Sequence, residues 1–315
     1  MTAVAATILV ACTEVDMVTT VNEATTQKAI DFDSYVGKST RTEFTDDESL
    51  HAAGFKVWGY TNESETVFDG ATVTWGSPVA DKWNCSVTKY WSKTATYDFY
   101  ATAPNADVMS WDNTNQKFTI TDAKSGLSTG DDVIDYLTAT KLGVTREENG
   151  DATVEFDFNH VMSKVAVELV KSSTIDASQE LKVTNVTMSG WNGSLGNYDS
   201  KGTPTVWTFE EPTNKTGKAV FVNAETGAIG TTATKVATEY LIVPQTIAAN
   251  GLVFTVSYTL GGLTYTNQTA KLTTEQTWAP NQFTTYTLTI GPEAIEFGVQ
   301  NITGWTPVSG GTTVQ

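Results

Sequence analysis

The residues of this chain that could act as nucleophiles, general bases or metal ligands are few and lie far apart. The only histidines are His51 and His160, and the only cysteines are Cys12 and Cys85. No His-x-His or Cys-x-x-Cys spacing is present, so the sequence predicts no zinc or copper site. A Ser-His-Asp or Cys-His triad would have to use one of the two isolated histidines. Cys85 has no activating motif beside it, and we interpret it as a buried free thiol.

Carboxylates are numerous, but they gather in segments that read as loops. Two carboxylates suffice for glycoside hydrolysis, yet an acidic β protein also places such clusters in its turns. The run from Asp112 to Asn115 resembles a fragment of a calcium loop without its Gly and distal Glu, so we expect a turn there. The sequence therefore predicts no enzyme, no metal site and no cofactor. The acidic clusters are Asp46-Asp47-Glu48, Asp131-Asp132, Glu147-Glu148 and Glu210-Glu211.

Composition and charge restrict the class of protein. The chain has 315 residues, a formal net charge of -17 and an isoelectric point near 4.4. Such a surface repels phosphate backbones and anionic lipid headgroups, so we expect no nucleic-acid partner. With 40% apolar residues, including 9 Trp, 11 Tyr and 13 Phe, it can fill two cores, and its length favours two domains. We expect most tryptophans in these cores, although aromatic faces can also stack against sugar rings.

Period-two patterns and turn signals predict an all-β fold. The first strand alternates through Ile30, Phe32, Ser34 and Val36 on one mostly apolar face. Further strands follow at short intervals, which favours sandwiches over βαβ units, and we find no convincing helix longer than two turns. The expected strands are 55–60, 71–75, 82–90, 96–102, 117–121, 133–137, 154–160, 165–170, 181–188, 206–209, 219–222, 239–243, 252–260, 263–267, 283–290 and 295–305.

The polar interval 141–151 predicts the boundary between two β-sandwich domains, because it is charged and ends in Asn149-Gly150-Asp151. We accordingly expect an N-terminal sandwich over residues 42–150 and a C-terminal sandwich over residues 151–290. Gly291-Pro292 then breaks the chain before a tail, residues 291–315.

The N-terminal segment resembles part of an export signal. Residues 1–11 carry no charged side chain, and Leu9-Val10-Ala11-Cys12 fits the bacterial lipobox, which predicts lipidation of Cys12. The stretch is too short to span a membrane, which takes about 20 apolar residues. It also lacks a basic n-region, so we interpret residues 1–12 as a partial lipoprotein signal. The alternative is a frayed tail with a chance cysteine.

Arginine is far rarer than lysine, with Arg41 and Arg146 its only instances. Arg41 lies in a loop of small polar residues directly after the first strand. A protease specific for arginine would cut between Arg41 and Thr42 and remove residues 13–41, a leader that includes this strand, while leaving both sandwiches intact. The alternative is two ordinary surface arginines.

Taken in order, the motifs of the chain resemble those of the fimbrillin-like proteins of Bacteroidetes, the subunits of lipoprotein-derived (type V) pili. The resemblance covers nearly the whole chain, and the ordered set is more specific than any single motif. It rests on the Cys12 lipobox, Thr40-Arg41-Thr42, the segments 54–60 (GFKVWGY), 97–104 (YDFYATAP), 156–165 (FDFNHVMSKV) and 240–245 (YLIVPQ), and Trp278 with residues 281–286.

The resemblance implies two tandem transthyretin-like sandwiches and a structural role in adhesion. It implies export as an outer-membrane lipoprotein, cleavage after Arg41 by an arginine-specific protease, and loss of the strand that contains Ile30, Phe32 and Val36. A strand of another pilin subunit would fill the vacated groove and build a head-to-tail pilus on the cell surface. The candidate donor strand is the C-terminal one, with alternating Ile295, Phe297 and Val299.

Two alternatives remain open from the sequence. The segment 295–305 is either a donor strand or the last strand of its own domain. The rival function is a surface-anchored lipoprotein that binds glycans through exposed tryptophans, keeps its N-terminal strand and stays monomeric.

Overall fold

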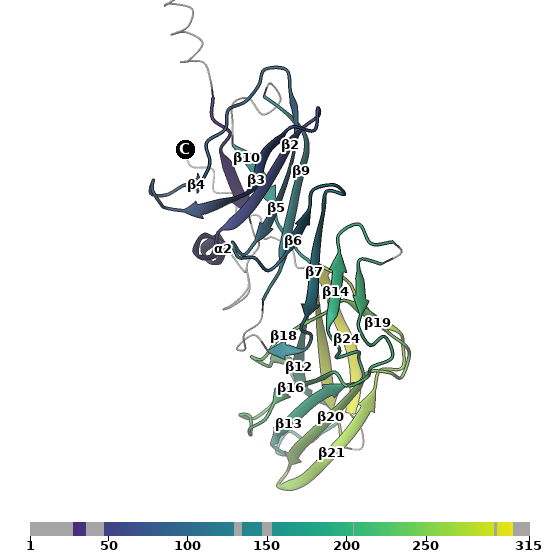
Figure 1. Cartoon of the computed structure of the whole chain (residues 1–315). Helices are drawn as coiled ribbons and strands as arrows, with labels where there is room; N and C mark the ends of the chain where they lie inside the picture. The colour runs from purple at the N-terminus through teal and green to yellow at the C-terminus, as the bar shows by residue number, and fades with distance from the viewer. Residues whose placement is uncertain are drawn as a thin grey trace, which may run out of the picture.

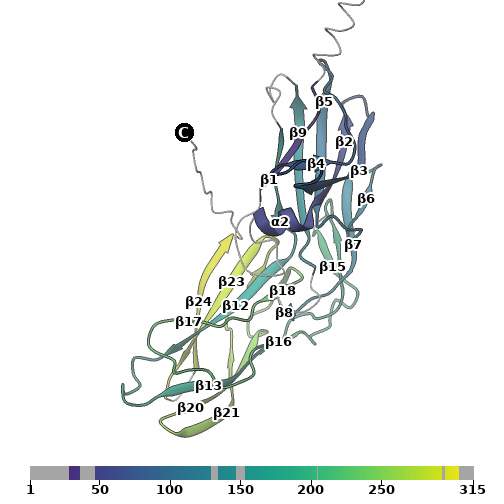
Figure 2. The ribbon, with the colours of Figure 1, turned by 90° about the vertical axis from the view of Figure 1, so that its left-hand side faces the viewer.

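The protein is almost entirely β-sheet and elongated, with two lobes (Figures 1 and 2). The computed structural model describes residues 28–35, 47–128, 134–146, 153–203, 205–292 and 295–304. We call the lobe built from the strands within residues 32–103 and 137–160 the N-terminal lobe. The lobe built from the strands within residues 163–189 and 218–304, to which residues 127 and 128 also pair, is the C-terminal lobe. The all-β prediction is confirmed.

A six-stranded antiparallel sheet forms the centre of the N-terminal lobe. The short helix α2 (Asp47–Ala53) leads into it, and a two-stranded parallel sheet lies against one of its faces. The parallel pair is β1 (Phe32–Tyr35) and β10 (Val154–Asp157). The six strands, in spatial order, are β11 (Asn159–His160), β9 (Leu137–Thr145), β5 (Thr96–Ala103), β2 (Phe55–Thr61), β3 (Thr66–Trp75) and β4 (Trp83–Cys85).

Other parts of the protein cover both faces of this central sheet, and β2 accordingly carries apolar residues on both of its faces. Phe55 and Val57 belong to the core beneath β1 and β10, whereas Trp58 and Tyr60 belong to a second core on the opposite face. Alternation along the strand sends these two pairs to opposite faces, and the pairing of β2 with β3 is irregular around Gly59. A Cβ atom at Gly59 would lie only 2.9 Å from the Phe99 ring, so the close packing there requires glycine.

A four-stranded antiparallel sheet covers the opposite face and joins the lobes. Its aromatic side chains share one core with Trp58 and Tyr100 of the central sheet and with Val161, Met162 and Leu241. Burial within this core raises the pKa of one of its tyrosines, Tyr198, to about 12. The strands, in spatial order, are β15 (Trp207–Phe209), β14 (Gly196–Asp199), β7 (Lys117–Ala123) and β6 (Ser110–Asp112).

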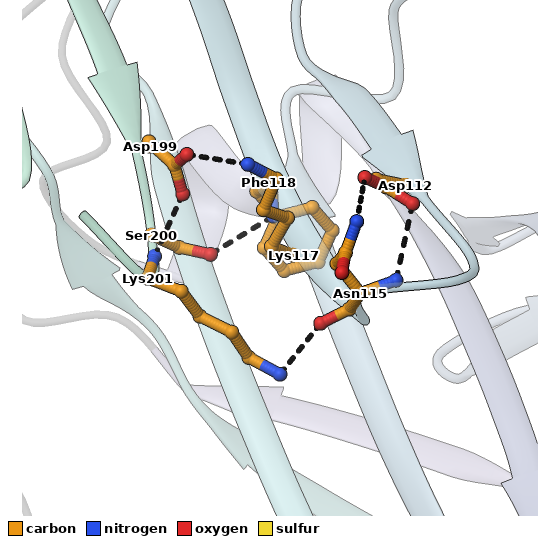
Figure 3. Close-up of polar contacts among 7 residues, drawn as sticks. All are labelled: Asp112, Asn115, Lys117, Phe118, Asp199, Ser200 and Lys201. Atoms are coloured by element: carbon orange, nitrogen blue, oxygen red, sulfur yellow. Dashed lines mark hydrogen bonds and ion pairs between the residues drawn. The ribbon is translucent and has the colours of Figure 1, made fainter.

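Polar contacts fix the β6–β7 hairpin to the end of β14 (Figure 3). Lys117 Nζ lies 2.5 Å from Asp199 Oδ2, and the Phe118 amide donates to Ser200 Oγ over 2.9 Å. The hydrogen bond from Lys117 holds the pKa of the Asp199 carboxyl below its usual value. Segments from the two halves of the sequence are therefore joined by side chains as well as by the sheet.

Two sheets facing one another build the C-terminal lobe, with a short β19–β22 pair beside them. The first runs in the order β24 (Ile295–Gly304), β23 (Gln282–Ile290), β12 (Ser163–Lys171), β18 (Tyr240–Ile242) and β8 (Leu127–Ser128), with β17 (Thr234–Lys235) also on β12. The second is β16 (Lys218–Val222), β13 (Leu181–Ser189), β20 (Val253–Leu260) and β21 (Leu263–Lys271), and the pair is β19 (Gln245–Ile247) and β22 (Gln276–Trp278).

Strict alternation marks the strands that face this core on one side only. In β20, Phe254, Val256, Tyr258 and Leu260 are buried while the residues between them are half-buried. Tyr286 of β23 is fully buried, and its hydroxyl accepts a hydrogen bond from Trp278 Nε1 over 2.9 Å. These alternating patterns are why the predictions at 181–188, 252–260 and 283–290 match β13, β20 and β23 closely.

Strand pairing crosses the predicted domain boundary at residues 150 and 151. β7 pairs with β14, β8 with β18, β1 with β10, and β11 with β9. A strand was expected at 133–137, whereas β9 runs from Leu137 to Thr145 into the interval interpreted as a linker. The middle of β9 is exposed, so its polar residues lack the apolar alternation that would have identified a strand.

Candidate functional site

The N-terminal strand lies in a groove between two backbone segments that are distant in sequence. On one side, the Ile30 amide donates to the Lys89 carbonyl over 2.8 Å, and the Trp91 amide donates to the Lys28 carbonyl over 3.0 Å. On the other side, β1 pairs in parallel with β10, and the Val154 amide donates to the Asp31 carbonyl over 2.8 Å. Segment 28–35 is thus an interior strand, hydrogen-bonded along both edges.

Aromatic side chains form the floor of this groove. The Phe32 ring centroid lies 5.1 Å from that of Phe68, 5.7 Å from that of Phe99 and 5.8 Å from that of Phe156. Ile30 and Phe32 are only 2% and 3% exposed. Because the hydrophobic effect is non-directional, such a floor favours a strand that offers apolar residues at the same spacing.

Ser34 is the polar member of the inward row. It follows Ile30 and Phe32 at the period-two spacing, and its Oγ is buried without a hydrogen-bond partner. The indole Nε1 atoms of Trp83 and Trp91, in the same core, are also buried and unpaired. A buried polar atom without a partner destabilises the folded state. The native strand therefore fills the groove imperfectly.

The predicted leader residues divide between the described and the undescribed parts of the chain. Ile30 and Phe32 lie in the groove on a strand with one apolar face, in the region where a strand was expected. Cys12, Val36, Arg41 and Thr42 lie outside the described residues. Arg146, the other arginine, is half-buried directly after β9.

The predicted donor residues lie in β24, at the edge of the first C-terminal sheet. β24 runs antiparallel to β23, with Ile295 opposite Ile290, Phe297 opposite Leu288 and Val299 opposite Tyr286. In this subunit the segment is thus paired within its own chain. Among the described strands, β23 is the one hydrogen-bonded to it. An edge strand with one neighbour can leave without breaking any other pairing in the sheet.

The residues that could do chemistry are separate and are engaged in structural contacts. His51 stacks on Trp75 with ring centroids 3.6 Å apart, and His160 Nδ1 lies 2.9 Å from the buried Asp135 carboxylate. Cys85 is half-buried rather than buried as expected, and burial raises the pKa of its thiol, which disfavours the nucleophilic thiolate.

Of the predicted acidic clusters, Asp47-Glu48 and Glu210-Glu211 are described, whereas Asp46, Asp131-Asp132 and Glu147-Glu148 lie outside the described residues. No group of three or more His, Cys, Asp or Glu side chains in the described part of the chain could hold a metal ion. The Asp112 carboxylate accepts hydrogen bonds from the Asn115 amide and side chain, which makes the expected turn (Figure 3). A hydrogen bond with Asp122 raises the pKa of Glu210, but both residues are exposed.

A cavity of about 570 Å³ lies beside β15, in the sheet that joins the lobes, and β22 of the C-terminal lobe. Its lining includes Trp207, Phe209, Pro244 and Trp278, with Lys215 among the polar residues. Trp207 and Trp278 are 6% and 1% exposed, so neither offers an open face for a sugar ring. The described tryptophans are all buried or half-buried, which confirms the expectation that most belong to the cores.

Sequence reasoning did not identify the groove walls. Segment 89–91 falls at the end of an expected strand, 82–90, of which only β4 forms, and β10 was assigned to the other domain. The buried alternation of Val154 and Phe156 signals one apolar face, but no local pattern specifies that this face packs on Phe32.

Within the described ranges, we find no helix of the length and apolar character needed to cross a membrane.

The family model described as fimbrillin-like matches residues 39–305. No match was found among curated proteins.

Solved structures similar to this fold come from several Bacteroides species. A fimbrial protein from Bacteroides vulgatus has 22% sequence identity and a TM-score of 0.68, covering 89% of this chain and 100% of that chain. A candidate cell adhesion protein from Bacteroides uniformis has 16% identity and a TM-score of 0.54, covering 89% and 99%. Another, from Bacteroides ovatus, has 13% identity and a TM-score of 0.54, covering 89% and 98%. At these identities the similarity establishes the fold.

Proposed function

Because the chain belongs to the fimbrillin-like family, we propose that it is a structural pilus subunit that polymerises by donor-strand exchange and supports adhesion. It is exported as an outer-membrane lipoprotein anchored through Cys12. A protease specific for arginine cuts between Arg41 and Thr42 and frees the strand that carries Ile30 and Phe32. A C-terminal strand of another subunit then enters the groove, and the assembled subunits form a pilus on the cell surface.

The observation that carries this proposal is the position of segment 28–35. It is an interior strand with Ile30 and Phe32 buried, and it lies N-terminal to Arg41, so a single cut there would separate it from the rest of the lobe. Its loss would leave two unpaired backbone edges, at 89–91 and at β10, with an apolar floor between them. Such a groove accepts an extended strand, whose backbone pairs with the edges while its alternate side chains fill the floor.

Burial keeps the intact subunit closed. Fully burying a large apolar side chain stabilises by about 1.5–3 kcal/mol, and Ile30 and Phe32 each contribute on this scale. While the leader is part of the chain, a free strand must compete with a covalently tethered one. After the cut, the leader loses this advantage, and a strand held at high local concentration can replace it.

The groove and the donor strand lie in different lobes of the subunit, and this arrangement determines the geometry of the polymer. The groove belongs to the N-terminal lobe and β24 to the C-terminal lobe (Figure 2). A contact between different surfaces of successive copies is heterologous, and it generates an open chain unless the rotation closes a ring. Strand exchange between these sites therefore gives a head-to-tail filament.

The test compares the two arginines. Wild type, Arg41→Ala and Arg146→Ala are treated with an arginine-specific protease and sized by light scattering and electron microscopy. We expect polymers from wild type and from Arg146→Ala, and monomers from Arg41→Ala. A wild type that stays monomeric after verified cleavage would favour the rival glycan-binding lipoprotein, and equal assembly of Arg41→Ala would also contradict the proposal.

A further inference from the structure

The leader and the candidate donor share a pattern that fixes how one would replace the other. The leader reads Ile30-Asp31-Phe32-Asp33-Ser34, and the C-terminal strand reads Ile295-Glu296-Phe297-Gly298-Val299. Both begin with isoleucine, carry phenylalanine two residues later and place an acidic residue between them. They differ at the third inward position, where the leader has serine and the donor has valine.

From this match we infer that Val299 of a second copy takes the place of Ser34 in the groove, with Ile295 at the site of Ile30 and Phe297 at the site of Phe32. This inference rests on the proposed function and specifies its register. The donor then runs in the same direction as the leader, parallel to β10.

The difference at the third inward position favours replacement of the leader by the donor strand. Ser34 Oγ is buried without a hydrogen-bond partner, so the leader loses its hydration there and gains no bond in return. A valine at the same site brings only apolar atoms and avoids that penalty. The donor therefore matches the leader at two inward sites and fits better at the third.

The outward positions provide a direct measurement of register. In the intact chain, Asp33 lies opposite Glu155 of β10, and both side chains are exposed. In the inferred register, Gly298 of the donor occupies the Asp33 position and lies opposite Glu155 of the neighbouring subunit. A reversed or shifted strand would bring a different residue to Glu155, because neighbouring positions alternate between the two faces.

The experiment uses the full chain with Cys12→Ser and Cys85→Ser, so that no native thiol competes. Subunits with Gly298→Cys are mixed with subunits with Glu155→Cys, cleaved with the arginine-specific protease and allowed to oxidise. We expect an intersubunit disulfide. Gln300→Cys, two residues further along the same strand, is the matched control and should not link to Glu155→Cys. Asp33→Cys with Glu155→Cys in the uncut chain is the positive control.

A second arm tests the role of the serine. Ser34→Ala removes the buried hydroxyl without adding volume, and Ser34→Val copies the donor. We expect both to raise the thermal midpoint of the uncut subunit and to slow release of the cut leader about tenfold. Val299→Ser should slow assembly by a similar factor, whereas Glu275→Gln, at an exposed position outside both strands, should leave the rate unchanged.

The outcomes separate this inference from the proposed function. Polymers that link through Gln300→Cys instead of Gly298→Cys overturn the register and leave strand exchange standing. Unchanged leader release in both Ser34 variants, with unchanged assembly of Val299→Ser, overturns the role of the third site. Cleaved wild type that forms no polymer overturns the proposed function and the register with it.

Discussion

The ring of Phe32 stacks on that of Phe156, with centroids 5.8 Å apart and an interplanar angle of 17°. Phe32 comes from the first described strand and Phe156 from β10, near the middle of the chain. Their contact places the N-terminal strand in the core of the N-terminal lobe. The strand is therefore part of that lobe's stability for as long as it stays attached.

Replacing Phe32 by alanine should destabilise the uncut subunit strongly. Large-to-small changes of buried Phe cost about 3–5 kcal/mol, because transfer energy is lost and a cavity remains. We expect this loss in the unfolding free energy of the N-terminal lobe, measured by urea denaturation followed by tryptophan fluorescence. Asp31→Ala, on the exposed face of the same segment, should change it by less than about 0.5 kcal/mol. Equal effects of the two variants would contradict the buried placement.

Lipidation should depend on Cys12. Metabolic labelling of cells with a fatty-acid analogue is expected to tag the wild type and not Cys12→Ser, because lipidation requires the thiol of the lipobox cysteine. Cys85→Ser is the matched control and should be tagged like the wild type, since Cys85 lies at the end of β4 within the folded lobe. Equal labelling of wild type and Cys12→Ser would refute the lipoprotein anchor.

The two histidines should differ in their importance for stability. His160 is 3% exposed and lies 2.9 Å from the Asp135 carboxylate, which is also buried. Removing one partner of a buried hydrogen bond costs about 1–3 kcal/mol, because the remaining polar group stays buried and loses that bond. We expect such a loss for His160→Ala in urea denaturation.

His51→Ala is the control for this prediction, because His51 is half-buried and its ring stacks on Trp75. Loss of one aromatic pair costs about 0.5–1.5 kcal/mol beyond the area it buries. If His51→Ala destabilises the protein as much as His160→Ala, the buried pair with Asp135 does not carry the stability assigned to it.

Much of the sheet structure could be predicted from the sequence, because strands that face one core show their period in the residues. Phe254, Val256 and Tyr258 alternate cleanly, and the strand was expected where β20 lies. β2 is buried on both faces, so its apolar run predicts a strand without indicating what covers each face. β9 was missed because its middle is exposed and polar.

The candidate site could be predicted only in part. The apolar face of Ile30 and Phe32 indicated a half-buried strand, and this is confirmed. Its partners could not be inferred, because pairing with Lys89, Trp91 and Val154 depends on long-range topology that no local pattern encodes. The same limitation explains why strand pairing crosses the expected boundary at residues 150 and 151.

Truncation after Gly291 should produce a folded subunit that stops polymer growth. It removes β24, which lies at the edge of its sheet next to β23, so the remaining sheet keeps all its other pairings. After cleavage at Arg41 the truncated subunit still offers a groove but supplies no donor, and alone it should remain monomeric by light scattering. Mixed with cleaved full-length subunits, it should accept a donor and end the chain, so polymers seen by electron microscopy shorten as its share rises. Arg146→Ala at the same share keeps both sites and should leave the length unchanged. Loss of the folded state in circular dichroism would show that β24 is a core strand of its own lobe, and undiminished polymer length would show that the donor lies elsewhere.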